Sequence, residues 1–179
     1  NPGATMFSPD ECTQWVTDIN ECNGGDLQVL EELIAQNGID EETSINDYDN
    51  GDGTFESLEM GEQFWVDGRL TEFNLWGDYW NGPFSYELAV IPNSIGNLSE
   101  LIYLELWDSQ LETLPESFGD LNQLEKLYIG DNPMVVFPEP IFNLTSLNIL
   151  YLCYTNIMEI PPEIGNLTNL EFLGLFDNQ

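Results

Sequence analysis

The stretch that decides the fold is IPPEIGNLTNLEFLGLFDNQ, residues 160–179. Its leucines, Leu167, Leu170, Leu173 and Leu175, belong to columns of apolar residues that recur every 23 positions along the chain. Nine columns, among them an asparagine and a proline column, hold over three full units, and a fourth unit is under way where the sequence stops. A period of this length indicates stacked structural repeats.

Each unit combines a short strand, a turn and a return segment. Leucines alternate with other residues in the x-L-x-L part, so the period of two sends the leucines inward and the intervening residues outward. Residues of the asparagine column, such as Asn132, can hydrogen-bond the neighbouring backbone where the chain turns. Proline then ends the apolar run, and the Ile-Gly-Asn-Leu segment returns as a short helical or irregular turn. Stacking buries the inward leucines, each of which contributes roughly 1.5–3 kcal/mol.

The repeat resembles the 23-residue form of the leucine-rich repeat family, L-x-x-L-x-x-L-x-L-x-x-N-x-L-x-x-L-P-x-x-I. The resemblance implies an α/β solenoid, a right-handed superhelix with short parallel strands on its concave face and a small helical N-terminal cap. Residues 1–65 then form the cap and residues 66–179 the repeats, with an aromatic loop inserted in the first unit and an incomplete last unit. Secreted bacterial members resemble this layout, with a helical cap that leads into a segment like WVDGRLTEFNLW, residues 65–76. We interpret the chain as the front part of a longer protein.

The cap is predicted to contain one helix, DLQVLEELIAQ, over residues 26–36. Asp26 is expected to cap its first turn. The apolar residues of the segment share one face, which is expected to cover the exposed edge of the first repeat. That face consists of Leu27, Leu30, Leu33 and Ile34.

An acidic segment, NDYDNGDGTFESLE at residues 46–59, resembles an EF-hand calcium loop. Calcium is bound by several converging oxygens, and a glycine at the sixth place, here Gly53, permits the sharp turn of such a loop. The first place holds Tyr48 instead of aspartate, so the usual geometry requires a shifted loop. Two interpretations stay open: a structural Ca²⁺ that locks the cap onto the solenoid, and an acidic turn without a metal. The resemblance implies the ligands Asp47, Asp49, Asn50, Asp52 and Glu59.

The chain has three cysteines, of which Cys12 and Cys22 lie close together before the first repeat. A disulfide between them would close a small loop, would contribute roughly 2–3 kcal/mol and would suggest an oxidising compartment. Two free thiols are the alternative. Cys153 is interpreted as a small filler in the strand, and an intermolecular disulfide is its alternative role.

The outward strand positions carry aromatic rings next to carboxylates, on a concave surface that is expected to face solvent. Exposed apolar patches of this kind usually bind something. Rings can stack on sugar faces while carboxylates accept hydroxyl hydrogen bonds, and tyrosine and tryptophan also anchor protein interfaces. The alternative is that the rings pack against one another along the sheet and stabilise the solenoid without a ligand. The candidate binding residues are Trp76, Tyr103, Glu105, Trp107, Asp108, Tyr128, Asp131, Tyr151, Tyr154, Phe172 and Phe176.

The charge balance excludes several classes of function. Thirty-three acidic residues face only Arg69 and Lys126, with no histidine, which gives a formal net charge of −31. Nucleic-acid binding requires basic residues, and anionic membranes repel such a chain. No apolar run approaches the roughly 20 residues that cross a bilayer. Cations, glycans and basic protein surfaces are the favoured partners, in a secreted or cell-surface setting.

Catalysis is not expected, because the chain lacks histidine, a phosphate-binding loop and a nucleophile elbow. The sequence therefore predicts an extracellular, non-enzymatic recognition or adhesion module that binds a protein or glycan through its concave face. The alternative is a structural subunit of a surface layer or filament, which self-associates through the solenoid ends.

Overall fold

The computed structural model describes residues 22–39, 60–75 and 88–179. In these ranges six strands form one sheet in the order β1 to β6. β1 pairs with β2 in the antiparallel sense, and every later pair is parallel. The strands are β1 (Glu62–Val66), β2 (Arg69–Asn74), β3 (Tyr103–Glu105), β4 (Lys126–Tyr128), β5 (Ile149–Tyr151) and β6 (Phe172–Gly174).

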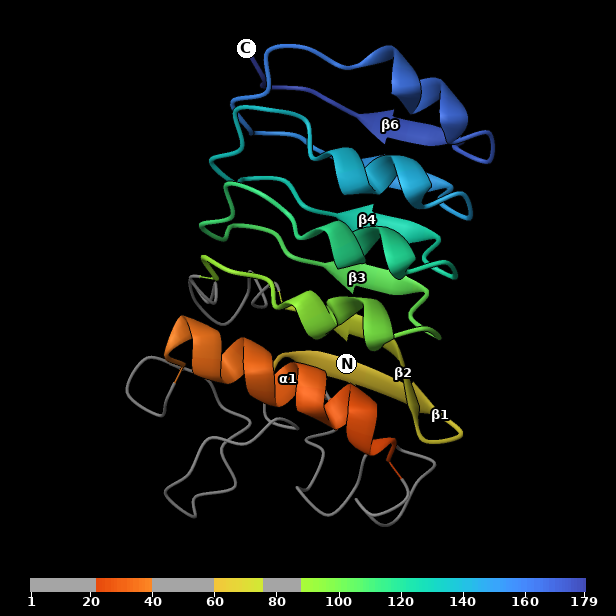
Figure 1. Cartoon of the computed structure of the whole chain (residues 1–179). Coiled ribbons are helices and arrows are strands. Elements are labelled where there is room, and N and C mark those ends of the chain that lie inside the picture. Colours follow the sequence, from red (N-terminus) through yellow and green to blue (C-terminus); the bar gives the residue numbers. More distant parts are fainter. Residues whose placement is uncertain (1–21, 40–59, 76–87) are drawn as a thin grey trace, which may run out of the picture.

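The 23-residue interval carries the chain from one strand to the same position in the next. Leu104 is paired with Leu127, which is paired in turn with Leu150. All three side chains are fully buried, whereas Leu173 in β6 is partly buried. The coils stack one above the other (Figure 1). This is the α/β solenoid that the sequence predicts.

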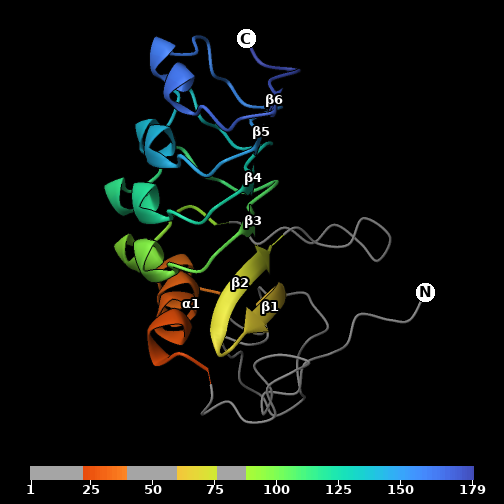
Figure 2. The same cartoon turned by 90° about the vertical axis from the view of Figure 1, so that its right-hand side faces the viewer.

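Short 3₁₀ helices make up the return segments on the face opposite the strands (Figure 2). Each helix begins directly after a proline of the proline column, whose fixed backbone suits the start of a helix. Buried side chains such as Phe118 and Ile141 connect these helices to the leucine core. The helices are η3 (Asn93–Asn97), η4 (Glu116–Asp120), η5 (Glu139–Asn143) and η6 (Pro162–Asn166).

Residues of the asparagine column hold the turns that follow β4 and β6. The buried Asn132 accepts a hydrogen bond from the Leu111 amide at 3.0 Å and donates to the carbonyls of Leu106, Ile129 and Gly130. One position earlier, the backbone is left-handed in every unit described. The residues with this conformation are Asp108, Asp131, Tyr154 and Asp177.

The cap helix α1 (Gly24–Asn37) lies against the first repeat, but its predicted cap residue is wrong. Asn23 is the N-cap, and its side chain accepts from the amides of Gly25 and Asp26. Asp26 is instead 1% exposed and faces β2. Its carboxylate binds the Arg69 guanidinium through two hydrogen bonds of 2.9 and 3.0 Å and accepts from the Leu70 amide.

The C-terminal end of α1 is held by a second polar contact. The Asn37 side chain accepts from the amides of Ala89 and Val90 and donates to the Val90 carbonyl at 2.8 Å. Between these two contacts, Leu30 and Leu33 are buried in the core. α1 is thus fixed to the solenoid at both ends.

Several predictions lie outside the described residues. They are the calcium ligands Asp47, Asp49, Asn50, Asp52 and Glu59, the disulfide partner Cys12, and Trp76 with the aromatic loop that follows it. Cys22 is buried, and its pairing with Cys12 stays a prediction. The division into residues 1–65 and 66–179 also stays a prediction. β1, which ends at Val66, spans the predicted boundary and pairs with β2 in the same sheet.

Candidate functional site

The concave face is built from the outward residues of the strands. Tyr103 of β3 lies beside Lys126 of β4, and Glu105 lies beside Tyr128, so outward positions form continuous rows across the sheet. The rows expected from the 23-residue interval therefore exist. Within the described ranges, their candidate side chains come from β3 to β6 and the turns that follow these strands.

Four rings form one stack along this face. The ring centroids of Tyr103 and Tyr128 are 5.4 Å apart, those of Tyr128 and Tyr151 4.9 Å, and those of Tyr151 and Phe172 4.7 Å. The last two pairs are stacked, and the first is tilted by 37°. We call Tyr103, Tyr128, Tyr151 and Phe172 the ring stack. Its members are partly exposed, with Phe172 at 44%.

A second set of rings lies two or three residues beyond the ends of β3, β5 and β6. Tyr154 packs edge to face against Trp107, with centroids 6.1 Å apart, and against Phe176, with centroids 5.2 Å apart. We call Trp107, Tyr154 and Phe176 the edge rings. Tyr154 and Phe176 are about half exposed. Such aromatic pairs favour tilted and edge-to-face arrangements and are worth roughly 0.5–1.5 kcal/mol each.

Two glycines make room for the rings. A Cβ at Gly130 would lie 2.4 Å from Cζ3 of Trp107, and a Cβ at Gly174 would lie 2.7 Å from a ring carbon of Tyr151. These rings therefore lie down over the backbone of the neighbouring repeat. The rings thus pack along the sheet, as the alternative without a ligand expects, and they also stay partly exposed to solvent.

Glu105 lies deeper than an outward strand position predicts. It is 8% exposed and accepts a hydrogen bond from the Tyr103 hydroxyl. Burial raises the pKa of the Glu105 carboxyl, although the bond from Tyr103 opposes this shift. Burial and the same bond raise the pKa of the Tyr103 hydroxyl. The pair thus places a poorly hydrated carboxylate within the face.

Exposed carboxylates border the edge rings. Asp108 and Asp131 occupy the left-handed turn positions of adjacent repeats, where aspartate is tolerated because its short side chain bonds locally. Partial loss of hydration beside neighbouring side chains, together with the nearby Asp108 charge, raises the pKa of the Asp131 carboxyl. Partial loss of hydration also raises the pKa of the Tyr154 hydroxyl, and Asp177 adds to this shift. The rim of the face is therefore negative.

Two further residues bear on the concave face. Cys153 is fully buried, as expected of a small filler, and its sulfur is not accessible for an intermolecular disulfide. Phe64 was missed: it lies on β1 directly opposite Glu72 and is 44% exposed. In β1 the exposed residues Glu62, Phe64 and Val66 alternate with buried ones. This period of two in the sequence could have placed Phe64 on the exposed side of the strand.

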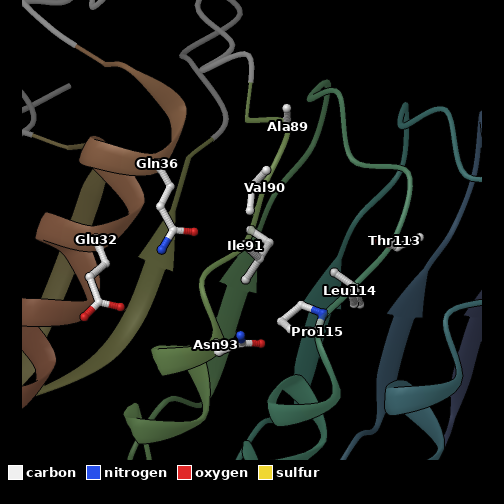
Figure 3. Close-up of a pocket in the computed structure, with 9 residues that line it drawn as sticks. All are labelled: Glu32, Gln36, Ala89, Val90, Ile91, Asn93, Thr113, Leu114 and Pro115. Carbon is white, nitrogen blue, oxygen red and sulfur yellow. The ribbon is translucent and has the colours of Figure 1, made fainter.

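A groove lies away from the concave face, between α1 and the segments that lead into η3 and η4 (Figure 3). Its volume is about 470 Å³. Glu32 is the one ionisable side chain among its described lining residues, and hydrogen bonds from Ser94 and Gln28 lower the pKa of its carboxyl. The lining consists of Glu32, Gln36, Ala89, Val90, Ile91, Asn93, Thr113, Leu114 and Pro115.

The repeats of this chain match a known protein family. Residues 86–179, more than half of the chain, match the family described as leucine-rich repeat region. The chain belongs to the leucine-rich repeat family. Leucine-rich repeats are generally a non-enzymatic fold for protein interactions. No curated protein sequence matches this leucine-rich repeat protein significantly.

Solved structures of other leucine-rich repeat proteins are similar. A leucine-rich repeat protein of Leptospira interrogans is 38% identical over 52% of this chain and 24% of its own, with a TM-score of 0.51. A plant ice-binding protein is 25% identical over 89% of this chain and 50% of its own, with a TM-score of 0.64. The BIR3–SERK2 complex of Arabidopsis thaliana contains a chain 26% identical over 63% of this one and 58% of its own, with a TM-score of 0.52.

The present chain thus spans between a quarter and just under three fifths of the length of these proteins. Within residues 22–39, 60–75 and 88–179, no helix is long and apolar enough to cross a membrane. The same ranges contain no group of three or more cysteine, aspartate or glutamate side chains arranged to hold a metal ion.

Proposed function

We propose that this leucine-rich repeat protein is a secreted or cell-surface recognition module that binds a partner protein through its concave face. The observation that carries the proposal is the ring stack, because it presents apolar edges and hydroxyl groups over four consecutive strands. Partly exposed tyrosine and tryptophan are the side chains that most often anchor protein interfaces.

The same stack favours a protein over a glycan. Sugars stack on the faces of aromatic rings, but Tyr128 and Tyr151 each have neighbouring rings centred within 5.4 Å. A neighbour on each side leaves mainly ring edges and hydroxyls for a ligand. Edges suit the side chains of a protein partner better than they suit a pyranose face.

The backbone at Tyr154 adds support. Its φ of 55° is left-handed, a conformation that the repeats on either side give to aspartate. Bulky residues adopt this region at a cost of roughly 1–2 kcal/mol, and such strain is concentrated at functional sites. A ring held here extends the edge rings toward the rim of the face.

A secreted or cell-surface location agrees with the strongly acidic sequence. The alternative of a self-assembling structural subunit predicts oligomers in solution. Size-exclusion chromatography with light scattering separates the two, since the recognition module is expected to be a monomer in the absence of a partner.

Paired binding screens test the proposal. A displayed random-peptide library and a glycan array are probed with the wild-type chain and with Trp107→Ala/Tyr128→Ala. We expect peptide binding that the double variant loses and no glycan signal that depends on these rings. Met158→Ala is the matched control, because Met158 is 64% exposed but lies outside the ring stack and the edge rings. Ring-dependent glycan binding, or peptide binding indifferent to the rings, would overturn the proposal.

A further inference from the structure

Glu105 has fewer hydrogen bonds than a buried carboxylate can accept. A carboxylate offers about four acceptor positions. Among the described residues, Tyr103 supplies its one hydrogen bond. Neither carboxylate oxygen is both enclosed and unpartnered, since Ser117 Oγ is the one such side-chain atom among the described residues. The spare acceptor positions of this poorly hydrated carboxylate are therefore open to a cationic group on the concave face. No residue of the ranges 22–39, 60–75 and 88–179 pairs the Glu105 carboxylate with a positive charge.

The two basic residues of the chain do not pair with Glu105. Arg69 is engaged by Asp26, and Lys126, on the neighbouring strand, forms no ion pair with any described residue. Glu62 lies near Glu105 and further raises the pKa of its carboxyl by charge repulsion. The described surroundings of Glu105 are thus negative and leave its carboxylate open to a cation of a partner.

Trp107 and two carboxylates near Glu105 are side chains that can bind a planar cation. Trp107 lies two residues beyond Glu105, just after the end of β3, and its ring rests over Gly130 of the next repeat. Asp108 and Asp131 follow at the turns of their repeats. A guanidinium group stacks on an indole ring and pairs with carboxylates through two parallel hydrogen bonds, which an ammonium group does not do.

We propose, on the premise that the concave face binds a protein, that the partner presents an arginine-containing basic segment to Glu105 and Trp107, with Asp108 and Asp131 at the rim. Charge complementarity identifies the occupant, because the chain carries a net charge of −31 and its carboxylates surround the rings. Such complementarity sets partner choice and association rate.

Any basic peptide is attracted to so acidic a protein, so the test has to distinguish the face from the bulk charge. Peptides are selected from a displayed random library on the wild-type chain. They are then measured against Glu105→Gln, against Asp108→Asn/Asp131→Asn and against the ring variant Trp107→Ala/Tyr128→Ala. Glu159→Gln is the control for the single charge removed in Glu105→Gln, and Glu159→Gln/Glu163→Gln is the control for the double variant, since both residues are exposed and lie outside the sheet. Circular dichroism confirms that each variant is folded.

We expect arginine-rich peptides whose Kd rises at least tenfold in Glu105→Gln and in the Asp108/Asp131 variant, but not in the controls. Replacing arginine by lysine in the peptide should also weaken binding. Neutral peptides that depend on Trp107 and Tyr128 would overturn this inference and leave the proposed function standing. Peptides weakened equally by the controls, or indifferent to the rings, would overturn both.

Discussion

Burial of Glu105 has a consequence for stability that depends on pH. Its carboxyl has a raised pKa in the folded protein, with burial as the main cause, whereas an ordinary glutamate titrates near 4.5. Between these two values the folded state holds a proton that the unfolded state has lost. Stability therefore falls as the pH rises through this window, and ionised Glu105 destabilises the fold at neutral pH.

We predict that Glu105→Gln raises the Tm at pH 7, because glutamine keeps an acceptor for the Tyr103 hydroxyl and removes the buried charge. The gain should shrink as the pH falls and should disappear below about pH 4.5. Thermal unfolding at a series of pH values measures this. Glu72→Gln, an exposed carboxylate on the same face, is the control for overall charge. An equal gain from both variants would contradict the prediction.

Asn132 shows how one side chain can hold a turn of the solenoid. Asn132→Ala should cost roughly 2–3 kcal/mol, because a buried amide donor and several carbonyls lose their hydrogen bonds. Asn122→Ala removes one exposed hydrogen bond, to the Asp120 carbonyl, and should cost less than about 0.5 kcal/mol. Urea denaturation of both variants measures the difference. If both variants lost a similar free energy of unfolding, burial of the Asn132 side chain would not explain its contribution to stability.

At the scale of elements, α1 is joined to the repeats by polar contacts at its two ends and by an apolar face between them. Asp26 binds Arg69 and the Leu70 amide, and Asn37 binds the segment at Ala89 and Val90. Contacts in a solenoid are mostly between neighbouring units, so the loss of one contact loosens the cap before it affects distant repeats.

Asp26→Ala should destabilise α1 by roughly 2–3 kcal/mol, since it leaves the Leu70 amide without its acceptor and Arg69 without its carboxylate. Hydrogen exchange should rise in α1 and β2 and change little in β5 and β6. Glu31→Ala, on the exposed side of α1, is the matched control. Uniform loss of protection along the chain would instead indicate one cooperative unit.

The EF-hand-like segment at residues 46–59 supplies an independent test at the same scale. If Ca²⁺ is bound there, 1 mM Ca²⁺ should raise the Tm by several degrees relative to EDTA, because a ligand of the folded state stabilises it by mass action. Glu59→Gln should abolish the effect, since the twelfth position supplies the bidentate carboxylate of such loops. Equal Tm values with Ca²⁺ and EDTA would favour the acidic turn without a metal.

At the scale of the whole molecule, the net charge of −31 opposes folding through self-repulsion. Salt shortens the range of this repulsion from about 30 Å at 0.01 M to about 3 Å at 1 M. We therefore predict that raising NaCl from 10 to 500 mM increases the Tm by roughly 2–4 °C, or about 1 kcal/mol for a chain of this length. Differential scanning calorimetry measures it, and a fall in Tm would show that attractive pairs outweigh the repulsion.

The sequence alone determined the repeat, the direction of each leucine and the rows of outward residues. This was possible because a period of two in a strand and an interval of 23 along the chain are local properties. The leucines of β3, β4 and β5 are buried where the pattern predicts, and Tyr103, Tyr128 and their neighbours lie outward. The prediction that Asp26 caps the helix was wrong. Aspartate is favoured at N-cap positions, but that preference does not indicate that Asp26 binds Arg69, 43 residues further along the chain.

Only the tertiary structure decided how the outward residues meet. The stacking of Tyr128 on Tyr151 and the position of Trp107 over Gly130 depend on the space that the next repeat leaves, which spacing along one chain does not specify. Burial of Glu105 and the addition of Phe64 to the face likewise follow from neighbouring strands. The backbone pattern is set by short-range geometry, whereas the chemistry of the face is set by contacts between units.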